Sequence, residues 1–133
     1  QPEIVTISGW KIGLSICYDL RFPELYRWYF KKQVDAVVVP SSFTYSTGEK
    51  HWHVLCRARA IENQCYVLAP NQCGLGAAQT QTYGHSLVAD PLGSVVAEAN
   101  DTDETVIQAT LDVKVLDATR EAMPVLSHCK MGI

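Results

Sequence analysis

The stretch KIGLSICYDLRFPELYRWYFKKQVDAVVVP, residues 11–40, decides the fold, because two apolar segments enclose one helical pattern. WKIGLSIC, residues 10–17, is typical of a short buried strand. A helix is predicted at 23–33, since Pro23 suits the first helical position. VDAVVVP, residues 34–40, is a continuous apolar run, and such runs fit strands that are buried on both faces and paired in parallel. The stretch therefore predicts a strand–helix–strand unit.

Each predicted helix should bury an apolar stripe against the sheet. In the helix at 23–33, Leu25, Trp28 and Tyr29 share one face at helical spacing. A longer helix is predicted at about 49–64. Its expected stripe consists of Val54, Leu55, Ala58 and Ile61.

The pattern changes in the second half of the chain. CYVLAP, residues 65–70, predicts one more buried strand, and the glycine-containing segment 71–84 predicts a long loop. SLVAD and SVVAEA flank the turn sequence PLG and predict a hairpin over 86–99. A further strand is expected at 104–112 and a helix at 113–122. This order predicts an α/β fold of α+β character, with helices layered on a mixed sheet.

Composition limits the classes of partner. The chain has 133 residues, 47% of them hydrophobic, and a net charge of −3, which gives no reason to expect nucleic acid or an anionic membrane as a partner. No apolar stretch approaches the roughly 20 residues that a membrane helix needs. The five cysteines form an odd number without short paired spacings, so we expect a reducing, cytoplasmic environment.

The sequence predicts neither a metal site nor a cofactor. His51 and His53 are two residues apart and cannot face the same side of a helix. Gly74 and Gly76 are not followed by the lysine of a phosphate-binding loop. In the second predicted helix, Arg59 and Glu62 stand at i and i+3, and the expected role is a structural ion pair.

Cys17 is the first candidate for chemistry, because it ends a buried strand just before a helix. Open α/β sheets place their ligands there, and backbone N–H groups at such a turn stabilise a thiolate or an oxyanion. The alternative is a small apolar residue that closes the strand. Tyr18, Asp19, Arg21 and Glu24 crowd the same place. They fit either an ion pair of Arg21 with one of the two carboxylates or direct contact with a substrate.

KIGLSICYDLRFPELYR closely resembles the nucleophile segment of the nitrilase, or carbon–nitrogen hydrolase, superfamily, in its Nit-type omega-amidase-like branch. VVVPSSF, HWHVLCRARAIENQCYVLAPNQCG and YGHSLVADPLGSVVAEA resemble the segments that follow in that family. The resemblance implies half of a four-layer α-β-β-α sandwich with mixed sheets. It also implies that residues 1–133 are the C-terminal portion of a single carbon–nitrogen hydrolase domain.

The resemblance also assigns roles. Cys17 aligns with the nucleophile that forms a thioester with a non-peptide amide, and the backbone N–H of Tyr18 would contribute to the oxyanion hole. The candidates for the substrate pocket are Arg21, Ser42, Phe43 and Thr44. The implied substrate is a small amide that bears a carboxylate, and the implied assembly is a homo-oligomer.

The sequence departs from the family in the rest of the catalytic triad. The family uses a Glu–Lys–Cys triad whose glutamate and lysine stand well upstream of the cysteine, whereas sixteen residues precede Cys17 here. Glu3 and Lys11 do not resemble the family positions, and Lys11 would lie about 20 Å from Cys17 along a strand. We therefore expect this chain to be inactive when alone.

Two other readings of the sequence stay open. The chain could be a non-catalytic assembly domain that keeps the nitrilase-like fold. It could instead be a thiol hydrolase in which Cys17 pairs with His85, in the manner of a cysteine protease dyad.

Overall fold

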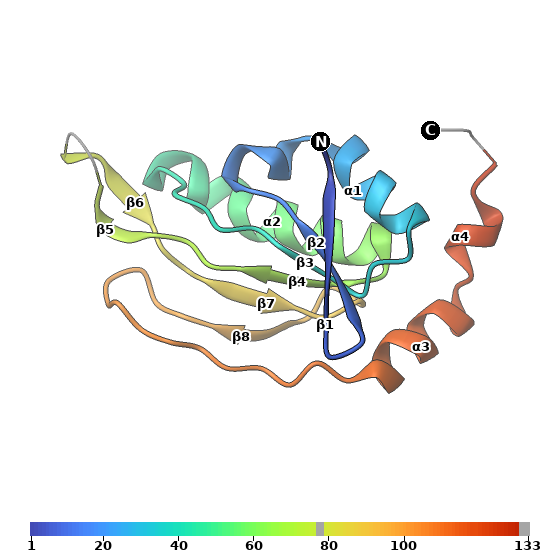
Figure 1. Cartoon of the computed structure of the whole chain (residues 1–133). Coiled ribbons are helices and arrows are strands. Elements are labelled where there is room, and N and C mark those ends of the chain that lie inside the picture. The colour runs from blue at the N-terminus through green and yellow to red at the C-terminus, as the bar shows by residue number, and fades with distance from the viewer. Residues whose placement is uncertain (77–78, 131–133) are drawn as a thin grey trace.

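The computed structural model describes residues 1–76 and 79–130, and a six-stranded mixed sheet forms its centre (Figure 1). In spatial order its strands are β1 (Glu3–Ile7), β2 (Trp10–Leu14), β3 (Ala36–Val38), β4 (Tyr66–Ala69), β7 (Leu87–Ala89) and β8 (Val95–Glu98). The strands β2, β3 and β4 are parallel, and every other neighbouring pair is antiparallel. The expected strand–helix–strand unit with parallel pairing is confirmed.

Two helices cover one face of this sheet, and two more follow it in the chain (Figure 1). The helices are α1 (Pro23–Lys31), α2 (Tyr45–Asn63), α3 (Val113–Ala122) and α4 (Val125–His128), with a 3-10 helix η1 at Cys17–Arg21. Trp52, Tyr26 and Leu20 are fully buried between the sheet and the helices α1 and α2. Gly48 lets α2 approach the backbone at Tyr83 closely, since a Cβ atom at position 48 would lie 2.3 Å from Cβ of Tyr83.

The predicted stripe of α1 is one position out. Tyr26, Tyr29 and Phe30 are buried, whereas Leu25 and Trp28 are only partly buried at the edge of the core. The two tyrosines point inward because their hydroxyl groups find polar partners at the end of β2 and just after it. The hydroxyl of Tyr26 lies 2.9 Å from Oγ of Ser15, and the hydroxyl of Tyr29 donates to a backbone carbonyl of β2.

The predicted stripe of α2 is wrong at Val54 and Ile61, whereas Leu55 and Ala58 are partly buried. Val54 is 67% exposed and Ile61 46% exposed. The residues that α2 buries are Gly48, Trp52, Cys56, Arg59, Ala60 and Asn63. Apolar periodicity could not find this face, because two of its long side chains are polar and are buried with polar partners.

The segment after β4 also differs from expectation. Instead of a loop throughout 71–84, it contains a two-stranded hairpin of β5 (Cys73–Leu75) and β6 (Gln81–Tyr83); positions 77–78 lie outside the described residues. The hairpin predicted over 86–99 is confirmed as β7 and β8. The strand predicted at 104–112 is wrong, because that segment joins no sheet in the described part of the chain. The helix expected at 113–122 is confirmed as α3.

The face of the sheet that points away from α1 and α2 is apolar and only partly covered. At one end, Leu116 of α3 packs with Ala36 and Tyr66. Elsewhere a hollow is lined largely by apolar side chains, among them Leu68 and Val88. The sheet and the pair α1 and α2 on one of its faces make two of the four layers of an α-β-β-α sandwich.

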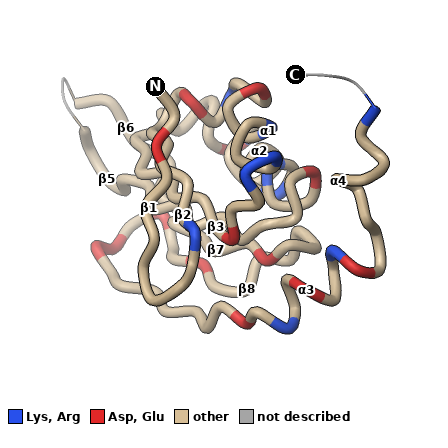
Figure 2. Tube along the Cα trace, turned by 45° about the vertical axis from the view of Figure 1, so that its right-hand side comes forward, with Lys and Arg blue, Asp and Glu red and all other residues tan. Residues whose placement is uncertain are grey.

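Lysine and arginine positions are interspersed with aspartate and glutamate positions along the described chain (Figure 2). Within the same residues, no helix combines the length and the apolar character that crossing a membrane requires.

Candidate active site

Cys17 is the first residue of η1, at a sharp turn just after β2, and lies outside that strand, contrary to the prediction of a strand over 10–17. Its φ of +44° places it in the left-handed region, which costs a residue with a Cβ atom about 1–2 kcal/mol. The turn is anchored to the next strand segment, because the N–H of Cys17 donates to the carbonyl of Pro40 at 2.8 Å. The thiol is partly buried at the edge of the core. Strain of this kind is typical of positions where a side chain must be presented outward.

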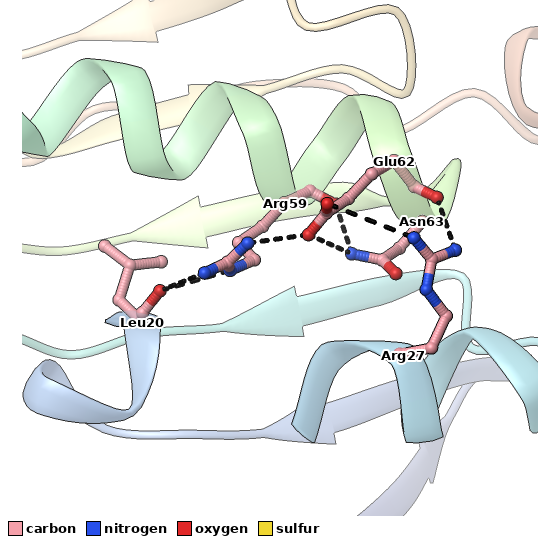
Figure 3. A network of polar contacts seen from close by, with 5 residues as sticks. All are labelled: Leu20, Arg27, Arg59, Glu62 and Asn63. Carbon is pink, nitrogen blue, oxygen red and sulfur yellow. Dashed lines mark hydrogen bonds and ion pairs between the residues drawn. The ribbon is translucent and has the colours of Figure 1, made fainter. Parts of the chain in front are cut away.

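Arg59 of α2 extends towards η1 and binds its backbone (Figure 3). Its Nε and Nη2 atoms donate to the carbonyl oxygen of Leu20 at 3.1 and 2.9 Å. The guanidinium also lies over the ring of Tyr26, 5.2 Å from the ring centre. The carbonyl of Leu20 belongs to the same 3-10 helix as Cys17, so a buried side chain fixes the turn that carries the thiol.

Glu62 balances the buried charge of Arg59. Its Oε1 atom accepts a hydrogen bond from Nη1 of Arg59 at 2.7 Å, which confirms the predicted ion pair. Arg27 of α1 donates to the backbone carbonyl of Glu62 at 3.0 Å, and Asn63 donates to the carbonyl of Arg59 at 2.9 Å (Figure 3). The network therefore joins α1, α2 and η1. The sequence indicated the pair but gave no sign of its contact with η1.

Arg21 points away from this network and onto aromatic rings. Its guanidinium carbon lies 5.1 Å from the centre of the Phe43 ring and 5.5 Å from that of Tyr18, and its Nη1 lies 3.2 Å from Nδ1 of His51. The carboxylate of Asp19 instead accepts the N–H of Ile16 at 2.9 Å and caps the turn.

The expected ion pair of Arg21 with Asp19 or Glu24 is therefore wrong. Within the described residues, Arg21 has no carboxylate partner. Its positive charge remains available to a bound anion.

The three pocket candidates after β3 differ in exposure. Phe43 is buried against Trp52, with ring centres 5.0 Å apart, so only part of its ring can contact a ligand. Its N–H donates to Oδ1 of Asn71 at 3.0 Å. Ser42 and Thr44 are exposed on either side of it. Asn71, which sequence reasoning missed, braces this loop by a second bond from Nδ2 to the carbonyl of Gly84 at 2.6 Å.

The structure therefore links Cys17, Tyr18, Arg21 and the loop after β3 in one region. The N–H of Cys17 donates a hydrogen bond to the carbonyl of Pro40, three residues before Phe43. The guanidinium of Arg21 contacts the rings of both Tyr18 and Phe43. His85 is engaged elsewhere, because its Nδ1 atom lies 2.9 Å from a carboxylate oxygen of Glu98. No hydrogen bond joins Cys17 and His85 in the part of the chain that the structure describes.

Comparison with known proteins agrees with this geometry. Residues 1–121 match the carbon–nitrogen hydrolase family. The chain is 49% identical over 127 residues to the nitrilase and fragile histidine triad fusion protein NitFhit of Caenorhabditis elegans, covering 96% of this chain and 28% of that protein. It is 46% identical over 127 residues to a deaminated glutathione amidase of Synechocystis, covering 96% and 46%.

A solved structure shows the same fold. Nit3 of Saccharomyces cerevisiae, a member of branch 10 of the nitrilase superfamily, superimposes with a TM-score of 0.88 at 40% identity, over 94% of this chain and 46% of Nit3. The chain thus belongs to the carbon–nitrogen hydrolase family, within the Nit-type branch of the nitrilase superfamily. It spans less than half the length of each of these three relatives.

Proposed function

We propose that this chain supplies the nucleophile and one wall of the substrate pocket of an amidase that cleaves a non-peptide carbon–nitrogen bond. The observation that carries the proposal is the strained turn at Cys17, which lies at the carboxyl end of β2 and is held by Pro40 on one side and by Arg59 on the other. A structural cysteine needs neither the unfavourable φ nor the buried cation beneath it.

The proposed reaction has two halves. The thiolate of Cys17 attacks the amide carbonyl, and the resulting tetrahedral oxyanion is stabilised by backbone N–H groups that include that of Tyr18. Collapse breaks the carbon–nitrogen bond, and ammonia or an amine leaves with a proton. Water then adds to the thioester, which releases the carboxylic acid and returns the thiol.

The general base and the lysine of the triad would come from chain segments beyond these 133 residues. Lys11 is held at the far end of β2, where its N–H donates to Asp35 at 2.9 Å, about 20 Å along the strand from Cys17. We therefore propose that this chain alone turns over no amide and that the complete enzyme, a homo-oligomer, does.

The proposed substrate is a small amide that bears a carboxylate. Arg21 lies beside the nucleophile turn with a positive charge that no described carboxylate neutralises, and guanidinium groups bind carboxylates in a bidentate manner. Several relatives are named as deaminated glutathione amidases, which supports an amide of this class.

Release of ammonia from a glutaramate analogue tests the proposal. The chain should be measured alone and extended upstream by the residues that Nit-type relatives carry, each with and without Cys17→Ser. We expect turnover only from the extended chain with Cys17 intact. Cysteine-dependent turnover by the 133 residues alone would contradict the external base, and an inactive extended chain would favour an assembly domain.

A further inference from the structure

Three side chains that are distant in sequence meet on the helix-covered side of the sheet, apart from the Cys17 turn. His53 lies on α2, His85 follows β6, and Glu98 ends β8. Nε2 of His53 is 2.8 Å, and Nδ1 of His85 is 2.9 Å, from the same oxygen, Oε1 of Glu98. The three ligand atoms lie within 4.8 Å of one another.

We propose that His53, His85 and Glu98 form a binding site for a borderline divalent cation of the Zn²⁺ type. Two imidazole nitrogens and one carboxylate oxygen are a donor set that zinc takes in proteins, with its fourth position left to water. A single carboxylate provides too few oxygens for Ca²⁺ or Mg²⁺. The site is independent of the amidase proposal, because none of its three ligands contacts the nucleophile turn.

The present spacing is close to what a bound ion requires. Bonds of about 2.0–2.2 Å would place tetrahedral donor atoms roughly 3.3 Å apart. Each nitrogen therefore has to move from the Glu98 oxygen by about 0.5 Å, and the two nitrogens, which lie no more than 4.8 Å apart, have to approach each other. The ion takes the place of both contacts with Glu98, and each imidazole then carries its proton on the nitrogen that does not bind the ion. Side-chain rotation alone provides such a shift, and all three side chains are between one quarter and two fifths exposed, so an ion can enter from solvent.

Neighbouring groups hold the ligands in place. The indole N–H of Trp52, next to His53 on α2, donates to the carbonyl of His85 at 2.7 Å. The ring of Tyr83 lies 4.5 Å from the His85 ring and 5.9 Å from the His53 ring. The three ligands lie on a helix and near the ends of strands, and the neighbouring Trp52 and Tyr83 set the orientation of the two histidines. Such an arrangement favours metal binding over a chance contact.

A bound cation would cross-link α2, the segment after β6 and β8. It would therefore stabilise the side of the fold that carries the hairpin of β7 and β8.

The test is calorimetric titration of the tag-free, metal-stripped chain with ZnCl₂, paired with thermal unfolding. We expect about one Zn²⁺ per chain and a rise in Tm of about 10 °C at a hundredfold excess over Kd. Mg²⁺ should give neither effect. Glu98→Gln keeps an oxygen that accepts hydrogen bonds, so it should fold normally and lose most of the Zn²⁺ response, as should His53→Gln.

Two controls separate this site from other zinc ligands. His128→Gln changes an exposed histidine outside the cluster and should respond to Zn²⁺ as the unchanged chain does. Co²⁺ bound at the site should lack the charge-transfer absorption that thiolate ligands give, which excludes the cysteines. Equal Zn²⁺ binding by Glu98→Gln, or the absence of any Tm rise in the unchanged chain, would overturn the proposal.

Discussion

Arg59 donates two hydrogen bonds to the carbonyl oxygen of Leu20, so a buried charge on α2 supports the 3-10 helix that begins at Cys17. The relationship couples the packing of α2 to the geometry of the proposed nucleophile, Cys17. It also gives α2 a role that its apolar residues do not explain, since Val54 and Ile61 face solvent while Arg59 is buried.

Arg59→Met should lower the free energy of unfolding by about 2–4 kcal/mol, because it leaves the carbonyl of Leu20 and the carboxylate of Glu62 without their partner. Arg59→Lys keeps the positive charge but not the planar guanidinium group. Its free energy of unfolding should lie between those of the unchanged chain and Arg59→Met. Urea unfolding measures the loss. Lys50→Met, at an exposed position of the same helix, is the control and should change little. A loss for Arg59→Met no larger than the control's would show that the contact with Leu20 is dispensable.

Gly48→Ala should destabilise the chain by about 1–3 kcal/mol, because the added methyl group would overlap the side chain of Tyr83. Intrinsic helix propensity alone predicts the opposite sign, since alanine is favoured over glycine inside a helix. Thermal unfolding distinguishes the two. Ser46→Ala, two residues away and exposed, is the matched control and should be neutral or slightly stabilising.

Cys17 should be alkylated by iodoacetamide much faster than Cys56 or Cys65 in the folded chain. Burial raises the pKa of the Cys65 thiol to about 12, and burial also raises that of Cys56, so neither forms thiolate near neutral pH, and both are fully buried. Peptide mapping by mass spectrometry assigns the label to each cysteine. Equal labelling of Cys17 and Cys65 before unfolding would contradict the prediction that the turn makes the Cys17 thiol accessible to the reagent.

Stability should fall as the pH rises from about 9 towards 12. Burial raises the pKa of Cys65 to about 12 from an ordinary value of 9.0, and it raises that of Tyr26 as well. Above pH 9 the unfolded chain therefore binds fewer protons than the folded chain, and the free energy of unfolding decreases by up to about 1.4 kcal/mol per pH unit for each such group.

Urea unfolding over this pH range measures the slope. Cys65→Ala should make it shallower at the alkaline end, because it removes one of the shifted groups. An unchanged slope in Cys65→Ala would show that the buried thiol does not cause the pH dependence.

The sequence predicted correctly those helices, strands and turns whose formation depends on a few adjacent residues. The Pro23 start of α1, the apolar run that contains β3, and the turn between β7 and β8 each depend on a few adjacent residues, and each is confirmed. The segment 104–112 alternates as a strand does, yet it pairs with nothing in the described chain. A strand needs a neighbouring strand, and local sequence does not supply that information.

The sequence predicted only part of the candidate site, because local sequence carries no information on partners that are distant along the chain. The motif around Cys17 predicts a nucleophile there, but the partners of its turn are tens of residues away: Leu20 and Arg59 are separated by 39 positions and Arg21 and His51 by 30. The three possible zinc ligands are spread over 45 positions. Spacing rules for metal sites consider near neighbours, so only the folded chain shows that these side chains meet.

In the proposed amidase, the left-handed backbone at Cys17 favours catalysis at the expense of folding. Glycine adopts this conformation without penalty, so Cys17→Gly would relieve the turn of the strain that its Cβ atom imposes. The version of this chain that forms the turn most readily is therefore one that could never make a thioester. Cys17→Gly would therefore ease folding of the turn and, by removing the thiol, abolish the proposed amidase reaction.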